Sequence, residues 1–291
     1  MSAAPAKVLS IAGSDSGGGA GIQADLKAFA RCGVHGMTAV TAVTAQNTVA
    51  VTGVYPLSPE AIVEQVRAVA DDIGVDAVKI GMLGTAQTIA AVDRALDLVP
   101  AAPVVLDPVM VAESGARLLD EDAQEALRTR ILPRAAVVTP NVPEAAVLAD
   151  EALLANEGAL PDAAESHHER LAVAVHRLGP GAVVLTGGHR EEVTDLFFDG
   201  ERLVEIPGPR FAGGASHGSG CTHSAALAAH LALGYEPLEA ARRAKSIAAE
   251  AVRDGLRDLG AGAGPVDVLG LTRDQSSAAR GAVGSAGGYR L

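Results

Sequence analysis

Short apolar runs alternate with longer amphipathic stretches along most of the chain. Aliphatic runs bounded by glycine or proline are typical of buried strands, and apolar residues at three- and four-residue spacing are typical of helices. The runs predict strands within 8–12, 38–43, 49–55, 77–83, 104–110, 136–144 and 182–189, with a hairpin formed by 194–198 and 202–206. The spacing predicts helices at 22–32, 59–72, 85–98, 121–132 and across the apolar run 225–233.

This alternation of strands and helices, with short loops between them, specifies a mostly parallel sheet covered by helices, so the chain is assigned to the α/β class. Polar residues and glycines gather where the expected strands end. These positions are Gln46, Gly81, Asp107, Asn141, Gly187 and the loop 218–221. Because ligands of open α/β sheets bind at that edge, the pattern predicts a ligand site there.

The composition limits the classes of binding partner and the cellular compartment that we expect for this protein. The chain has 291 residues, 48% of them hydrophobic and only 2% aromatic, which suits aliphatic strands under alanine-rich helices. A formal net charge of −12 disfavours nucleic acid and anionic membranes as partners, because both are bound through Lys and Arg. Residues 1–7 lack a signal-peptide pattern, and no apolar run is long enough for a bilayer. Two cysteines make no disulfide framework, so we expect a cytoplasmic protein.

The stretch 216–222 reads Ser-His-Gly-Ser-Gly-Cys-Thr and stands at the start of the alanine-rich helix. Gly218 and Gly220 allow a tight turn, and the helix N-terminus offers unpaired amides and a positive dipole end that bind anions. Cys221 is in a position that favours a thiolate, suited to a base or a nucleophile. The alternative is a glycine loop that caps a core helix around a small buried thiol.

A second glycine-dense loop, 13–21, follows the first strand and lets the backbone approach a small ligand closely. Its spacing fits neither of the common nucleotide-binding glycine motifs. Asp25, one turn into the next helix, is expected to face the same site, or else to be a charge favoured by the helix dipole. His189 and His217 are interpreted as loop histidines, and His167-His168 lacks the further ligands that a metal site needs.

Six segments in this order resemble the hydroxymethylpyrimidine and phosphomethylpyrimidine kinases of thiamine biosynthesis, within the ribokinase-like superfamily. They are Ile11 to Lys27, Thr44-Ala45-Gln46-Asn47-Thr48, Lys79-Ile80-Gly81-Met82-Leu83, Leu106-Asp107-Pro108-Val109-Met110, Thr139 to Ala145 and His217-Gly218-Ser219-Gly220-Cys221-Thr222. The resemblance implies a three-layer αβα sandwich over 1–266. Residues 267–291, rich in Gly, Ala and Ser, are expected to form a largely disordered tail.

The resemblance also implies an activity: ATP-dependent phosphorylation of 4-amino-5-hydroxymethyl-2-methylpyrimidine and then of its monophosphate, with Mg²⁺, in a homodimer. Gln46 would bind the pyrimidine, within a pocket that the substrate shares with Gly13, Asp25, Met82 and Val109. The catalytic loop would consist of Gly218, Ser219, Gly220 and Cys221. The nucleotide side would consist of Asp107, Asn141, Glu144 and Thr186, with Glu144 and Asp107 on the metal, if need be through water.

Several positions keep a structural alternative. Asp107 before Pro108 also suits a turn, Met82 suits a core position, and Gln46 suits an ordinary loop. Thr186 stands where many relatives carry lysine, so that cation is missing at this position. The competing functions are a pyridoxal or dual-specificity kinase of the same fold, and a non-catalytic protein that senses the pyrimidine.

Overall fold

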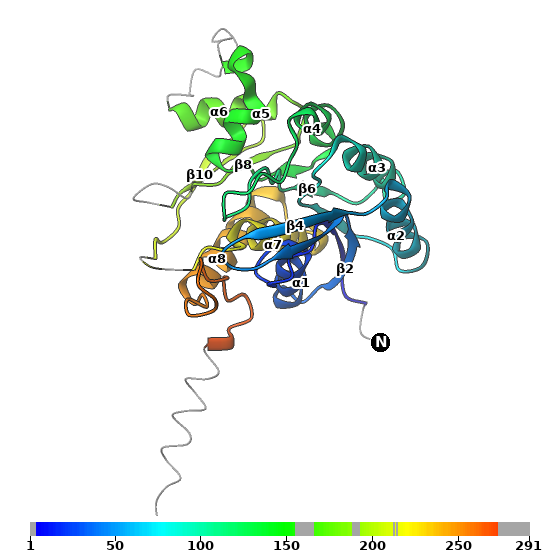
Figure 1. Ribbon diagram of the computed structural model, residues 1–291. Helices are drawn as coiled ribbons and strands as arrows, with labels where there is room; N and C mark the ends of the chain where they lie inside the picture. Colours follow the sequence, from blue (N-terminus) through cyan, green and yellow to red (C-terminus); the bar gives the residue numbers. More distant parts are fainter. Residues whose placement is uncertain (1–3, 155–165, 188–192, 212, 214, 273–291) are drawn as a thin grey trace, which may run out of the picture.

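The computed structural model describes residues 4–154, 166–187, 193–211, 213 and 215–272 (Figure 1). Its centre is an 8-stranded sheet in the order β10-β9-β8-β7-β6-β5-β1-β2. The strands are β1 (Lys7–Ala12), β2 (His35–Val40), β5 (Ala77–Ile80), β6 (Val104–Leu106), β7 (Val137–Val138), β8 (Val183–Leu185), β9 (Asp195–Phe198) and β10 (Leu203–Ile206). The pairs from β2 to β8 are parallel, and the predicted β9–β10 hairpin adds the antiparallel edge.

Helices cover both faces of this sheet (Figure 1). One layer consists of α1 (Gly21–Arg31), α7 (Ser219–Ala232) and α8 (Pro237–Arg253). The other consists of α2 (Pro59–Asp72), α3 (Ala86–Leu96), α4 (Glu121–Ala126), α5 (Val142–Leu154) and α6 (His167–His176). In β1, Leu9 and Ile11 join the second layer's core while Val8 joins the first, as expected for a strand buried on both faces. The three-layer αβα arrangement with a mostly parallel sheet is confirmed.

The strand predicted at 38–43 is divided in two. β2 ends at Val40, and β3 (Ala42–Gln46) pairs with β4 (Val51–Pro56) in a separate antiparallel sheet. Thr41 makes the break, because its amide donates to Ala12 O and its hydroxyl donates to Met82 O. The break could not be predicted because apolar residues continue across it in the sequence. As a result of the break, Gln46 lies outside the main sheet.

Other boundaries also differ from the prediction. The helix expected at 121–132 is α4 followed by a π-turn, η1 (Leu127–Ile131), and a 3-10 turn, η2 (Leu132–Arg134). Pro133 has no amide to continue the α-helical ladder. The whole of α8 was not predicted. The disordered tail predicted for 267–291 starts too early in the sequence, because the first of these residues are ordered. Val268 is buried, and Asp267 accepts hydrogen bonds from the amides of 270–272.

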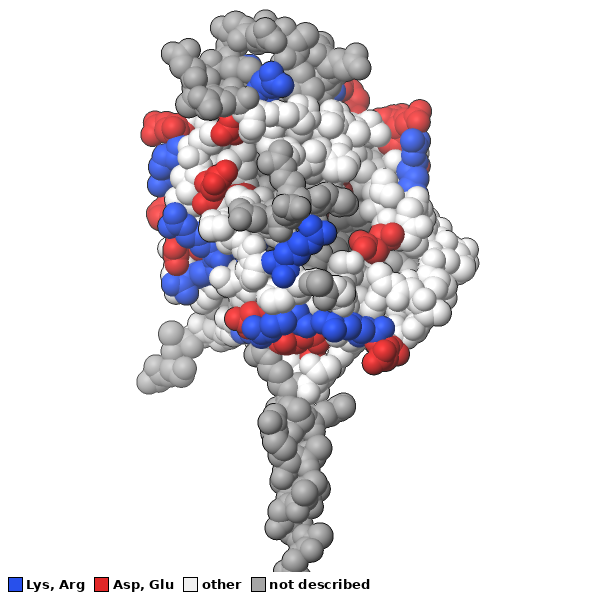
Figure 2. All heavy atoms as spheres, turned by 90° about the vertical axis from the view of Figure 1, so that its left-hand side faces the viewer, with Lys and Arg blue, Asp and Glu red and all other residues white. Residues whose placement is uncertain are grey.

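The remaining predictions concern residues outside the described ranges, the charge of the surface and membrane-spanning helices. His189 and residues 273–291 lie outside the described residues. On the face shown in Figure 2, Lys and Arg side chains lie among Asp and Glu side chains. Within the described ranges, no helix combines the length and apolar character needed to cross a membrane.

Candidate active site

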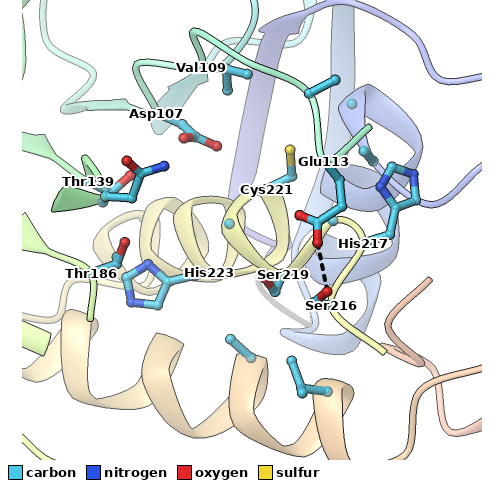
Figure 3. Close-up of a pocket in the computed structure, with 18 of the residues that line it drawn as sticks. Asp107, Val109, Glu113, Thr139, Thr186, Ser216, His217, Ser219, Cys221 and His223 are labelled. Carbon is cyan, nitrogen blue, oxygen red and sulfur yellow. Dashed lines mark hydrogen bonds between the residues drawn. The ribbon is translucent and has the colours of Figure 1, made fainter. Parts of the chain in front are cut away.

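A cavity of about 570 Å³ lies where the parallel strands end, at the edge that the sequence indicates. Twelve of the thirteen predicted site residues line it. They are Gly13, Gln46, Met82, Asp107, Val109, Asn141, Glu144, Thr186, Gly218, Ser219, Gly220 and Cys221. Figure 3 shows Asp107, Val109, Thr186 and Cys221 around this space. Segments separated by most of the chain thus meet in one pocket.

We call the loop 216–221, which leads into α7, the anion loop. It contains two glycines, and each position requires glycine for a different reason. Gly218 is the N-cap with φ 81°, and a Cβ there would collide with the carbonyl oxygen of Gly19. Gly220 is exposed in the pocket, and a Cβ there would meet no protein atom within 4 Å. The first amides of α7 have no partner within the helix and form a ready site for an anion.

His217 joins the anion loop to the glycine-dense loop after β1. Its Nε2 lies 3.0 Å from Asp15 Oδ2. The same carboxylate accepts hydrogen bonds from the amides of Gly17, Gly19 and Ala20. Burial opposes ionisation of Asp15, but these contacts outweigh it and lower the pKa of the carboxyl. His217 is therefore a satisfied loop histidine, as expected, and it fixes the two loops against each other.

Asp25 does not line the pocket, which corrects its expected contact with the substrate. The carboxylate is fully buried, accepts from Ser10 Oγ at 2.6 Å and lies 3.0 Å from Lys79 Nζ. Burial raises the pKa of Asp25 and the ammonium of Lys79 opposes that rise. Lys79 also lies 3.8 Å from Asp107. Burial alone would lower the pKa of Lys79, but the two carboxylates raise it, so the lysine stays charged beneath the pocket floor.

Cys221 lies in the first turn of α7 but is not a ready thiolate. Burial raises the pKa of its thiol to about 12, and the charge of Lys79 opposes this only in part. Nearby Asp107 and Asp25 raise it further. The expected lowering by the helix dipole is therefore wrong: loss of hydration and two carboxylates outweigh it. At neutral pH Cys221 presents an S–H group to the pocket.

Asn141 and Glu144 form a reciprocal cap at the start of α5. Asn141 N donates to Glu144 Oε2, and Glu144 N donates to Asn141 Oδ1, both at 2.9 Å. Burial, and then the charge of Asp107, raise the pKa of Glu144 to about 7. Asp107 itself accepts from Ser224 Oγ at 3.1 Å. Asp107 disfavours the charge on Glu144, and the two carboxylates are hard oxygen donors of the kind that suits a divalent cation.

The predicted substrate side is formed by β3 and the loop after β1. The Ser16 hydroxyl donates to the backbone carbonyl of Gln46 at 2.6 Å and accepts from its backbone amide at 2.9 Å. The Gln46 side-chain oxygen accepts from Thr44 Oγ1 at 3.3 Å. A Cβ at Gly13 would collide with the terminal methyl of Met82, so the glycine makes room for that side chain. Gln46 is thus held in place at the pocket wall.

Sequence reasoning gave no site role to several charged or ionisable residues that line the pocket, among them Lys79, Asp195, His223 and Lys245. A lysine within the buried run Ala-Val-Lys-Ile was a usable signal for Lys79. Lys245 gave none, because a lysine on an amphipathic helix is usually on the surface. Glu113 was missed too; its Oε1 accepts from Ser216 Oγ at 2.8 Å across the pocket mouth (Figure 3). Within the described part of the chain, no group of three or more His, Cys, Asp or Glu could hold a metal ion.

Comparison with known proteins agrees with this geometry. The family model for phosphomethylpyrimidine kinase matches residues 15–267. A hydroxymethylpyrimidine/phosphomethylpyrimidine kinase from Rhizobium meliloti (strain 1021) is 48% identical over 89% of this chain and 95% of its own. The protein of the same name from Bacillus subtilis (strain 168) is 42% identical over 94% of this chain and 98% of its own.

Solved structures give the same fold. The pyridoxal kinase from Staphylococcus aureus in complex with AMP-PCP and pyridoxal aligns with a TM-score of 0.78 and 34% identity, over 93% of this chain and 96% of that one. The chain therefore shares the ribokinase-like fold with this pyridoxal kinase. Because the family model covers most of the chain, and curated relatives match at more than 40% identity nearly end to end, the chain belongs to the phosphomethylpyrimidine kinase family.

Proposed function

We propose that this protein transfers phosphate from ATP to 4-amino-5-hydroxymethyl-2-methylpyrimidine and then to the resulting monophosphate, giving the pyrophosphate. The observation that carries the proposal is the anion loop: exposed Gly220 and the first amides of α7 face the same pocket as Gln46, Met82 and Val109. The names of the curated relatives and the family match support the choice of acceptor.

The anion loop supplies the main rate enhancement. Phosphoryl transfer passes through a loose transition state with charge on the equatorial oxygens, so fixed donors matter more than covalent chemistry. The amides of Gly218, Gly220 and Cys221 are such donors, and Gly218 holds them in place through its left-handed backbone. The Ser219 amide instead donates to Ser216 O at 3.0 Å, within the anion loop. Cys221 stays protonated at neutral pH, so it assists by contact and hydrogen bonding and is not a pre-formed base.

Gln46 gives the selectivity for an aminopyrimidine. Its side-chain amide carries both a donor and an acceptor, which matches a ring nitrogen next to an exocyclic amino group. Gly13, Met82 and Val109 supply a compact apolar wall for the ring. The backbone of Gln46 is held by Ser16, so little ordering is needed when the ring binds.

Asp107 and Glu144 would hold Mg²⁺ between the protein and the nucleotide. Mg²⁺ keeps several waters and binds through one or two carboxylates together with substrate phosphates, and both Asp107 and Glu144 line this pocket. The ion would neutralise negative charge on the phosphates. We further propose that the protein is cytoplasmic, in keeping with its two free cysteines, Cys32 and Cys221.

Two copies are proposed to associate through the β3–β4 sheet. Val43 and Tyr55 are cross-strand partners in that sheet, with 49% and 64% of their surfaces exposed. An exposed apolar pair on a short sheet is suited to packing against its own copy across a two-fold axis.

A pyridoxal kinase is the second candidate, because the structure of Staphylococcus aureus pyridoxal kinase with AMP-PCP and pyridoxal shares this fold. The deciding experiment offers ATP and Mg²⁺ with hydroxymethylpyrimidine or with pyridoxal, and follows product masses over time. Mono- and then diphosphate on the pyrimidine supports the proposal. Phosphate on pyridoxal alone would change the acceptor and keep the mechanism. Binding of the pyrimidine without turnover would identify a sensor.

A further inference from the structure

The loop between β6 and α4 brings a carboxylate to the mouth of the pocket. We call its middle part, which folds back on itself, the mouth loop (110–118). Val111 and Arg117 form an antiparallel bridge within it. The amide of Leu118 donates to Met110 O at 2.8 Å. Glu113 lies at the turn of this loop, is exposed to solvent and lines the pocket, but has no role in the reaction as described above.

One hydrogen bond joins Glu113 to the anion loop. Its Oε1 accepts from Ser216 Oγ at 2.8 Å, although the two residues are 103 positions apart in the sequence. Figure 3 shows this bond, with the carboxylate directed at Ser216 beside the start of α7. Because a serine hydroxyl is uncharged, the bond fixes the carboxylate in place without neutralising it. The contact therefore holds a negative charge next to the anion loop.

The two lysines that line the same pocket are each paired with another carboxylate. Lys79 Nζ lies 3.0 Å from Asp25 Oδ1, and Lys245 Nζ lies 2.6 Å from Asp195 Oδ1. Each of these positive charges is balanced by the carboxylate beside it. Glu113 has a neutral hydroxyl in the corresponding place, so its charge acts on whatever anion enters the pocket.

Under the proposed function, the acceptor reacts within reach of this charge. The anion loop holds the phosphoryl group that is being transferred, so the acceptor oxygen must approach it to about 3–3.5 Å. Gly218, the N-cap of α7, is two positions after Ser216, and two residues span at most about 7 Å. The carboxylate of Glu113 is therefore on the order of 10 Å from the acceptor oxygen, about one screening length at 0.1 M salt.

The two acceptors differ most in charge. The hydroxymethyl group of the first acceptor is neutral. The monophosphate that is the second acceptor carries about −1.5 to −2 at pH 7, because the second pKa of a phosphate ester is about 6. A fixed negative charge at the mouth thus leaves the first acceptor unaffected and repels the second.

We propose that Glu113 is a specificity-determining residue that makes the pocket favour the neutral hydroxymethylpyrimidine over its monophosphate. Ser216 acts as a positioning residue, because it holds the carboxylate against the anion loop. This inference rests on the proposed function, which places both acceptors in this pocket. It assigns the slower of the two phosphorylations to the charged acceptor.

The first test measures dissociation constants of the hydroxymethylpyrimidine and its monophosphate by calorimetry, without nucleotide and at low salt. Glu113→Gln keeps the side-chain length and an oxygen that accepts from Ser216, and removes only the charge. The variant should bind the monophosphate about 3- to 10-fold more tightly and the neutral pyrimidine unchanged. Glu113→Lys should extend the gain to about 10- to 100-fold. An unchanged monophosphate constant in both variants, or an equal change for both acceptors, would overturn the proposal.

Glu64→Gln is the matched control. Glu64 is an exposed glutamate on α2 outside the pocket, and its substitution changes the net charge by the same amount. Both dissociation constants should stay unchanged in this variant. A gain for the monophosphate equal to that of Glu113→Gln would assign the effect to total charge and contradict a specific role of Glu113.

The second test separates charge from the shape of the mouth loop. Raising the salt from about 0.01 M to about 1 M shortens the screening length from about 30 Å to about 3 Å. The difference between the unaltered protein and Glu113→Gln in monophosphate affinity should disappear over this range. A difference that persists at high salt would show that the substitution alters the loop itself, and the charge argument would fail.

The proposed function and this inference fail in distinguishable ways. Phosphorylation of the pyrimidine by the unaltered protein reports on the function. The ratio of the two dissociation constants, measured without nucleotide, reports on Glu113. Turnover together with a ratio that Glu113→Gln does not change would overturn the inference alone. If neither acceptor binds, the proposed function fails and the inference fails with it.

Discussion

At the scale of single residues, burial decides the chemistry of Cys221. Its thiol has a pKa of about 12, against an ordinary value of 9.0. We predict that iodoacetamide at pH 8 labels Cys221 at least about 100-fold more slowly in the folded protein than after unfolding, because the reactive thiolate is suppressed. Peptide mass spectrometry measures the two rates. Rapid labelling of folded Cys221 would restore the thiolate as a candidate base.

The same shift has a consequence for stability, and its sign is definite. The unfolded thiol ionises near pH 9.0 while the folded thiol stays neutral up to about 12. The contribution of Cys221 is therefore fully present below pH 9 and is lost as the pH rises toward 12. The free energy of unfolding of Cys221→Ala should fall less steeply over that range. Cys32, whose pKa burial raises to about 11, is common to both proteins and cancels.

A substitution at Gly220 should affect turnover without destabilising the fold. A Cβ there meets no protein atom and the residue is helical, so Gly220→Ala should keep or slightly raise the melting temperature. The methyl group would project into the pocket and displace the phosphoryl group, so we predict a loss of turnover of about 100-fold. Gly218→Ala is the contrasting variant: its φ of 81° and the collision with Gly19 should destabilise the fold itself. Full activity in Gly220→Ala would exclude the loop from catalysis.

At the scale of elements, Lys79 ties three of them together beneath the pocket. It lies on β5 and contacts Asp25 of α1 and Asp107 after β6. Lys79→Met should lower the free energy of unfolding by about 3–5 kcal/mol, because it leaves buried carboxylates without a counter-charge. Adding Asp25→Asn should recover much of that loss. Urea unfolding measures the free energy of unfolding of Lys79→Met and of the double variant Lys79→Met with Asp25→Asn. Equal stability of these two variants would show that Lys79 and Asp25 are not energetically coupled.

The elements also explain which parts of the site the sequence could predict. Loops that follow apolar runs end at one sheet edge, so Asp107, Asn141 and the anion loop were found from pattern alone. Asp25 was misplaced because its position one turn into the helix does not say which side of that helix faces the pocket. His223 and Lys245 were missed because their pocket is made by the packing of α7 against α8 and β9, which no local pattern records.

At the scale of the whole molecule, the alternation of strands and helices was sufficient for the three-layer architecture, because a strand buried on both faces needs a helix on each side. The departure of β3 and β4 from the main sheet was not predictable, since Thr41 breaks the run through tertiary hydrogen bonds to Ala12 and Met82. That departure places Gln46 at the pocket and leaves Val43 and Tyr55 facing outward. One feature therefore serves both the proposed binding of the substrate and the proposed association of two copies.

The proposed association gives the last prediction. If two copies pack through the β3–β4 sheet, a charge at Tyr55 must be buried without a partner when they meet, which costs several kcal/mol and favours the separate chains. Tyr55→Lys should therefore halve the mass measured by light scattering at micromolar concentration. Val147→Lys, at a residue 43% exposed on α5, is the matched control and should leave the mass unchanged. A monomeric unaltered protein, or a Tyr55→Lys variant that stays dimeric, would rule out this sheet as the interface. Because Gln46 belongs to β3, loss of the dimer should also raise the KM for the pyrimidine more than the KM for ATP.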